Sequence, residues 1–173
     1  YTGSAIEPAA TVKVQVYRNT AGEGADPALE WVDVAAADAP QYYTLAFANN
    51  VNVGQAAVTA TAKQGDGADA PKVVGSASAT FDIVAADASS ATVSAADATY
   101  TGGPVSPQVT VTLAGKQLVQ GTDFTVAYTD NVEPGTGSAT ATVTFKGNYK
   151  GMGSDTFSIG KADLASGSMG ALT

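Results

Sequence analysis

Cysteine and histidine are both missing from the 173 residues of this chain. Their absence excludes Ser-His-Asp and Cys-His nucleophiles, thiolate and imidazole metal ligands, and disulfides. Basic residues are also scarce, because 8 Lys and Arg stand against 16 Asp and Glu, for a formal net charge of −8. We therefore expect no binding to nucleic acid, since phosphate contacts need clustered Lys and Arg.

Long hydrophobic runs are absent as well. No stretch of about 18 apolar residues occurs, so we expect no membrane span. The chain starts at Tyr1 without a signal peptide, as a mature product or an excised fragment does. Its acidic, Thr- and Gly-rich composition without Cys suits an extracellular location, in a secreted or wall-anchored protein.

What the chain does contain is an internal repeat. Tyr1-Thr2-Gly3 recurs as Tyr100-Thr101-Gly102 (100 − 1 = 99). Two later blocks also recur, Tyr43 to Phe47 as Phe124 to Tyr128 (124 − 43 = 81) and Thr80 to Ile83 as Thr156 to Ile159 (156 − 80 = 76). The falling separation indicates that the first copy carries 18 extra residues (99 − 81) within 15–42 and 5 more (81 − 76) within 64–74.

A further match defines the order of the modules. Ala86-Asp87 and Thr92-Val93 match Ala162-Asp163 and Ser168-Met169, again 76 residues apart. In the second copy this segment precedes the Tyr-Thr-Gly motif, so it opens the module. We therefore predict a first repeat at 1–85 that lacks its opening strand and carries an insertion, a second repeat at 86–160, and the opening strand of a truncated third repeat at 161–173.

Both copies show the period-2 alternation of half-buried strands. Val109, Val111 and Leu113 alternate with Thr, and Phe124, Val126 and Tyr128 alternate with Thr and Ala. We predict an all-β chain of two tandem immunoglobulin-like β-sandwich domains, since turn signals follow about every 8 to 12 residues. The Ala-rich segment 84–98 is assigned to strand because its repeat partner has a strand pattern, whereas a short helical turn within 34–39 stays open.

The second copy resembles tandem bacterial immunoglobulin-like repeats. The resemblance lies in Tyr100-Thr101-Gly102, Gly121-Thr122-Asp123-Phe124, Lys146-Gly147-Asn148-Tyr149 and Thr156-Phe157-Ser158-Ile159. Such repeats occur in large secreted or wall-anchored surface proteins of Gram-positive bacteria. The resemblance implies a non-catalytic extracellular module of a stalk or adhesin, and it names no ligand because the fold class hosts many functions.

The insertion in the first copy supplies the candidate ligand contacts, Trp31 with Glu30 and Asp33. Loops on a rigid scaffold often carry binding residues, and a Trp there can contact a sugar or a partner protein. The alternative is that Trp31 packs over a sheet edge or belongs to a longer hairpin. Glu30 and Asp33 form an acidic pair of the kind that glycosidases use, but nothing in the sequence places them in a cleft.

Two other signals are weaker. The acidic loop from Gln64 to Asp69 lacks the ligand spacing and terminal Glu of an EF-hand, so a solvated loop is favoured over a calcium site. Lys13, with Asn49, Asn50 or Asn131, could form an isopeptide bond, but Lys13 aligns with Thr112 and an outer-face Lys is favoured. We predict no catalytic residue, no metal and no cofactor.

These observations favour a spacer, stalk or adhesive segment of a bacterial surface protein. Its partners would be neighbouring repeats of the same chain and a host or microbial surface protein or glycan. The alternatives are a carbohydrate-binding module that uses Trp31 and an ancillary domain of a large secreted enzyme. A first repeat without an opening strand has an unfilled sheet edge or groove, which the tail 161–173 of another molecule could fill by head-to-tail strand donation.

Overall fold

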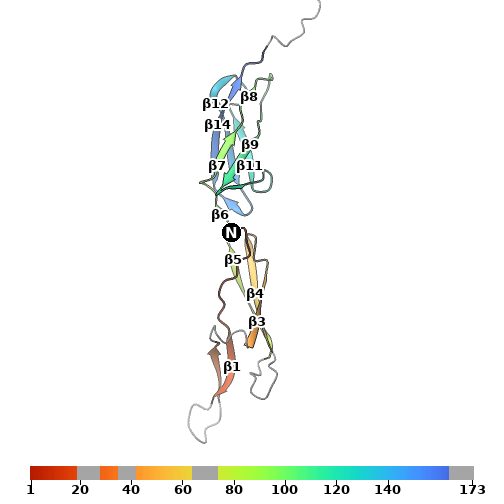
Figure 1. Cartoon of the computed structure of the whole chain (residues 1–173), viewed down its shortest axis with the longest axis vertical. Helices are drawn as coiled ribbons and strands as arrows, with labels where there is room; N and C mark the ends of the chain where they lie inside the picture. Colours follow the sequence, from red (N-terminus) through yellow and green to blue (C-terminus); the bar gives the residue numbers. More distant parts are fainter. Residues whose placement is uncertain (19–27, 35–41, 64–73, 164–173) are drawn as a thin grey trace, which may run out of the picture. The chain divides into compact units, whose positions relative to one another are not determined.

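The computed structural model describes residues 1–18, 28–34, 42–63 and 74–163. Every element bounded within these residues is a strand, and the strands are numbered β1 to β14 along the chain (Figure 1). The prediction of an all-β chain is therefore confirmed. The chain divides into two compact units, Tyr1–Val84 and Ala85–Thr173. The helical turn considered within 34–39 and most of the 161–173 tail lie outside the described residues.

Unit 1 combines a β-hairpin with a three-stranded antiparallel sheet. The hairpin pairs β1 with β2, and the sheet has the order β3-β4-β5. The strands are β1 (Lys13–Arg18), β2 (Ala28–Asp33), β3 (Tyr43–Ala48), β4 (Gly54–Ala62) and β5 (Ser76–Ile83). Buried positions alternate along β4 at Ala56, Val58 and Ala60, so one face of this sheet forms the core of the unit.

Unit 2 contains two larger sheets and a short parallel pair. One sheet has the order β10-β9-β7 and the other β11-β12-β14-β8, while β13 pairs with β6. The strands are β6 (Ala86–Asp87), β7 (Thr92–Ala95), β8 (Ala98–Thr99), β9 (Val109–Leu113), β10 (Lys116–Gln117), β11 (Phe124–Thr129), β12 (Gly135–Phe145), β13 (Tyr149–Lys150) and β14 (Met152–Gly160).

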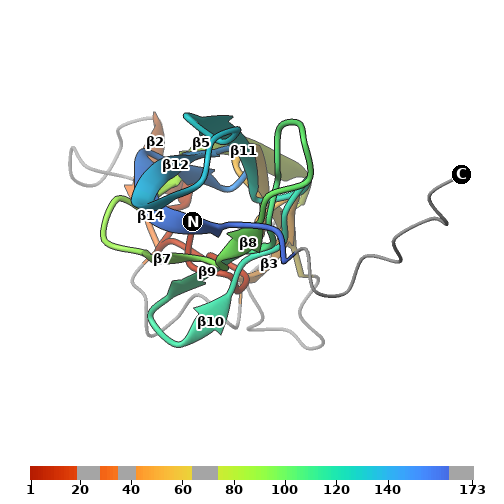
Figure 2. The same ribbon diagram turned by 90° about the horizontal axis from the view of Figure 1, so that it is seen from above.

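The two larger sheets of unit 2 share one core. Its largest fully buried side chains come from both sheets, Val111 from β9 and Phe124, Val143 and Phe157 from the other. Figure 2 looks along the strands and shows β7, β9 and β10 below β11, β12 and β14. Aromatic and β-branched residues at every second position drive this arrangement, because each strand then presents one apolar face to the opposite sheet.

The two copies of the repeat have the same local geometry. The Asn50 side chain donates a hydrogen bond to the carbonyl of Ile6 at 3.1 Å, and Asn131 donates one to Val105 at 2.7 Å. In both copies the backbone returns the bond, from Ile6 N–H to Asn50 O at 2.8 Å and from Val105 N–H to Asn131 O at 2.9 Å. Asn131 follows Asn50 by 81 residues and Val105 follows Ile6 by 99 residues, which are the separations found in the sequence.

Aromatic packing repeats as well. Phe47 and Phe81 contact edge to face with ring centroids 6.4 Å apart, and Tyr128 and Phe157 do so at 6.1 Å. Phe47 of β3 contacts Phe81 of β5 across β4. In the same way, Tyr128 of β11 contacts Phe157 of β14 across β12. The sequence repeat is therefore a repeat of hydrogen bonds and packing.

The insertion of the first copy is mostly a longer hairpin. Val34 N–H bonds to Val12 O at 2.9 Å, and Leu118 N–H bonds to Val111 O at 2.9 Å. These bonds are equivalent, because Val12 and Val111 are 99 residues apart, so Val34 corresponds to Leu118 at a separation of 84. Of the 18 extra residues, 99 − 84 = 15 lie within the β1–β2 hairpin and 84 − 81 = 3 lie between Val34 and Tyr43.

The difference of five residues further along has two parts. Ala56 of β4 pairs with Phe81, and Ala139 of β12 pairs with Phe157 in the same way. Ala56 and Ala139 are therefore equivalent, and β4 and β12 are 139 − 56 = 83 residues apart at this point. The ladder of β12 is irregular between Gly135 and Ala139, where the second copy holds 83 − 81 = 2 extra residues. The first copy then holds 83 − 76 = 7 extra residues between β4 and β5, for a net of five.

Candidate functional site

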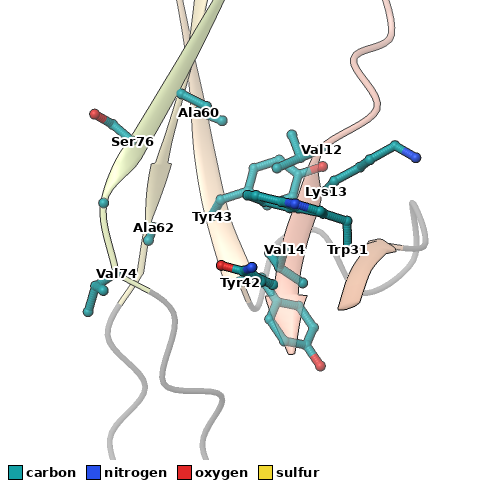
Figure 3. Close-up of a pocket in the computed structure, with 13 residues that line it drawn as sticks. Val12, Lys13, Val14, Trp31, Tyr42, Tyr43, Ala60, Ala62, Val74 and Ser76 are labelled. Carbon is teal, nitrogen blue, oxygen red and sulfur yellow. The ribbon is translucent and has the colours of Figure 1, made fainter. Parts of the chain in front are cut away.

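A groove of about 610 Å³ lies between the hairpin and the three-stranded sheet of unit 1 (Figure 3). Its walls come from β1, from β4 and from the start of β5, with Trp31 of β2 and the aromatic pair Tyr42 and Tyr43 completing it. The lining is mainly apolar, since Val12, Val14, Ala60, Ala62 and Ala77 contribute to it. Such a groove suits an apolar or extended ligand.

Of the predicted site residues, only Trp31 lines the groove. Trp31 lies on β2 opposite Gln15 of β1, and its side chain is 65% exposed. It belongs to the longer hairpin, the alternative considered from the sequence, and the hairpin brings its ring to the edge of the groove (Figure 3). An exposed indole at such a place can stack on a flat ligand surface.

Glu30 and Asp33 do not form a joint site. They lie three positions apart on one strand, so their side chains point to opposite faces of the hairpin. Asp33 pairs with Lys13 at 3.3 Å, and both of these side chains are 59% exposed. An exposed pair of this kind contributes at most about 1 kcal/mol. Glu30 and Asp33 therefore do not face one substrate together.

Three of the four residues considered for an isopeptide bond have other contacts. Lys13 makes the ion pair with Asp33, while Asn50 and Asn131 donate to backbone carbonyls of their own copies. Asn49 has a positive φ of 55°, as Asp130 has at the equivalent position with 54°. Both residues belong to turns, where Asn and Asp accept this conformation most readily.

Among the described side chains, Asp87 and Tyr128 have shifted pKa values, and both shifts have structural causes. The backbone N–H of Ser89 donates to Asp87 at 2.9 Å and, with the Ser89 hydroxyl and the charge of Lys150, holds the pKa of Asp87 below its usual 3.8. Burial raises the pKa of Tyr128 above its usual 10, and its hydroxyl donates to Pro107 O at 2.6 Å. Asp87 orders the turn after β6, and Tyr128 anchors the segment before β9.

Metal binding finds no support in the part of the chain that is described. No group of three Asp or Glu residues gathers there in a way that could hold an ion. The acidic loop from Gln64 to Asp69 lies outside the described residues. No helix among the described residues is long and apolar enough to cross a membrane.

The sequence did not predict the groove of unit 1, because the residues that line it are far apart along the chain. Val12, Tyr43, Ala62 and Ala77 each carry the signal of an ordinary core position. Comparisons of the chain with protein-family models, with curated proteins and with solved structures find no match. The site is therefore interpreted from its own geometry.

Proposed function

We propose that the chain is a non-catalytic repeat segment of an extracellular bacterial surface protein, in which two tandem immunoglobulin-like β-sandwiches act as a spacer or adhesive stalk. The observation that carries the proposal is the repetition of the same contacts in both copies, above all the paired Asn50–Ile6 and Asn131–Val105 hydrogen bonds. A chain that repeats the same scaffold contacts from module to module is suited to a spacer.

The chemistry of the chain supports this role. Its acidic, Cys-free composition suits an exterior surface, and the sequence resembles repeats of wall-anchored proteins. The candidate acids Glu30 and Asp33 point away from each other, which removes the pair that a glycosidase would need. Neighbouring repeats of the same protein are the expected partners.

Mechanical unfolding of the single chain tests the spacer role. A tethered stalk made of independent modules should unfold in two separate steps, each releasing about 3.5 Å of contour per residue. The measurement is force spectroscopy on the full chain, held at its two ends. Phe157→Ala should lower the force of one step and leave the other unchanged. A single cooperative step that both units share would contradict the proposal.

A second candidate function rests on Trp31. Its exposed indole lies on a groove that Tyr42 and Tyr43 also line, and aromatic rings at such places stack on sugars. If the chain is a carbohydrate-binding module, a glycan array should show binding that Trp31→Ala abolishes. Val119→Ala, at a residue that is 58% exposed in unit 2, serves as the control and should bind normally. An array without signal would leave the spacer role as the better account.

A further inference from the structure

The outer edge of β11, inside unit 2, carries backbone groups that can pair with another strand. Lys146 N–H bonds to Asp123 O at 2.8 Å, and the ladder of β11 with β12 continues from this pair. Because hydrogen bonding alternates along an antiparallel ladder, Thr125, Ala127 and Thr129 bond to β12, and the residues between them turn their N–H and C=O groups to the outer side. In the part of the chain that the structure describes, no strand lies on that side.

The open part of this edge has a definite start and end. At its start, the outward carbonyl of Phe124 already accepts a bond from Gly121 N–H at 2.8 Å. At its end, β11 stops before Asp130, whose positive φ of 54° is not an extended conformation. The segment 125–129 lies between these limits, and Ala127 is its midpoint.

The edge of β11 lacks the usual protection against strand pairing. The edge strands β8 and β10 of the same unit have two residues each, and β10 contains Lys116. By contrast, β11 has six residues without Pro or charge, and its register with β12 is regular. The equivalent strand β3 also has no Pro and no charge, so the feature belongs to the repeat. Long, uncharged and regular edges are the ones that pair with other chains.

We propose that β11 pairs with β11 of a second copy of this chain, antiparallel and about a two-fold axis at Ala127. In this register Val126 of each molecule lies opposite Tyr128 of the other. The outward backbone groups of Val126 and Tyr128 have no partner among the described residues. Each of these N–H groups then donates to a C=O group of the other molecule, so the open segment is fully paired.

Other registers fit the edge less well. An axis at Val126 would place Tyr128 opposite Phe124, whose carbonyl is already bonded. An axis at Tyr128 would place Val126 opposite Asp130, which is not extended. An axis between two residues would place Val126 opposite Ala127, whose backbone groups bond to β12. The axis at Ala127 is therefore the one that the free groups select.

The side chains agree with this register. Ala127 is exposed and small, so two copies of it can lie opposite each other with Cα atoms about 4.5 Å apart. On the same face, Thr125 of each molecule lies opposite Thr129 of the other, and such cross-strand Thr pairs are favourable. Both molecules keep their core faces on one side, so the two sheets join into one.

This dimer goes beyond the proposed spacer role and does not depend on it. Both molecules use the same surface, so the contact is isologous and closes as a pair. Two copies would associate side by side through unit 2, with strand pairing as the form of recognition.

A cysteine at the two-fold axis tests the pairing, and the Cys-free chain gives a clean background. Ala127→Cys should form a disulfide-linked dimer under mild oxidation, because a Cα separation of about 4.5 Å lies within the range for a disulfide. Thr144→Cys is the matched control, since Thr144 is exposed on the same face but lies on β12, inside the sheet. Salt at about 0.15 M limits the repulsion between the flanking acids Asp123 and Asp130, because the Debye length is then about 8 Å.

The rates of dimer formation are compared after correction for the reactivity of each thiol toward a small reagent. Ala127→Cys should dimerise at least about tenfold faster than Thr144→Cys, because docking raises the effective concentration of the thiols. Equal rates would overturn the proposal. Ala46→Cys, at the equivalent position of β3, tests the other edge. Faster linkage of Ala127→Cys to Ala46→Cys than to itself would overturn the symmetric pairing.

Two further variants test the backbone ladder and the axis. Val126→Pro removes an outward N–H and keeps the bonds to β12, since Pro is accepted where the N–H of an edge strand faces solvent. Combined with Ala127→Cys, it should abolish the rate advantage while circular dichroism still shows the folded chain.

Competition gives the same answer without any change to the ladder. An excess of the parent chain, or of Thr144→Lys, should slow the crosslinking of Ala127→Cys. Ala127→Lys places like charges opposite each other at the axis, so it should compete at least about tenfold less well. Equal competition by Ala127→Lys and Thr144→Lys would overturn the proposal, even if Val126→Pro fails to fold.

Discussion

Phe157→Ala should destabilise unit 2 by about 3–5 kcal/mol, the range for removing a buried aromatic ring. Phe157 is 1% exposed and packs edge to face against Tyr128 with an interplanar angle of 87°. Its partner across the ladder is Ala139, which is fully buried and too small to fill the space left behind. The cavity would remain open, so its cost adds to the lost burial.

Denaturation followed by two signals measures this effect. The sole tryptophan, Trp31, lies in unit 1, so its fluorescence reports on that unit, whereas circular dichroism reports on the strands of both. Phe157→Ala should move the circular dichroism transition of unit 2 to lower urea and leave the Trp31 transition in place. Phe81→Ala is the matched control, since Phe81 is equivalent but only half-buried. Its smaller effect should appear in the Trp31 signal, and the reverse pattern would contradict the assignment.

The strands of unit 2 could be predicted from the sequence because one face of each is buried. Val109 and Val111 are buried while Thr110 is exposed, as the alternation indicated. The division of the repeats at 1–85, 86–160 and 161–173 stays a prediction, although the compact units meet between Val84 and Ala85. The strand order of the sheets was beyond the sequence, because it depends on long-range pairing that local patterns do not encode.

The insertion shows what local sequence patterns cannot predict. Its 18 extra residues could be counted from the sequence, but their role in a longer hairpin depends on the bond between Val34 and Val12. Once β2 is known to be a strand, Glu30 and Asp33 must point to opposite faces, so of these two acids only Asp33 shares a face with Trp31. An unfilled edge or groove was expected in the first repeat, but the residues that line the groove could not be named without knowing how the strands pair.

Val143→Asp should destabilise unit 2 by at least about 4 kcal/mol at pH 7, because it buries a charge without a partner. Val143 is fully buried on β12, between Val126 of β11 and Gly153 of β14. Domains of this size are stable by about 5–15 kcal/mol, so the substitution takes up much of the stability of the unit. Urea denaturation by circular dichroism would measure the loss.

The dependence of this loss on pH identifies its cause. Burial raises the pKa of the introduced carboxyl above its unfolded value of about 3.9, so the folded state keeps the proton to higher pH. Stability relative to the parent chain should therefore be greatest near pH 4 and fall as the pH rises through the folded pKa. Thr144→Asp adds the same charge one position along, on the exposed face, and should change stability by no more than about 0.5 kcal/mol. Equal losses for Val143→Asp and Thr144→Asp would mean that β12 does not present alternate residues to the core.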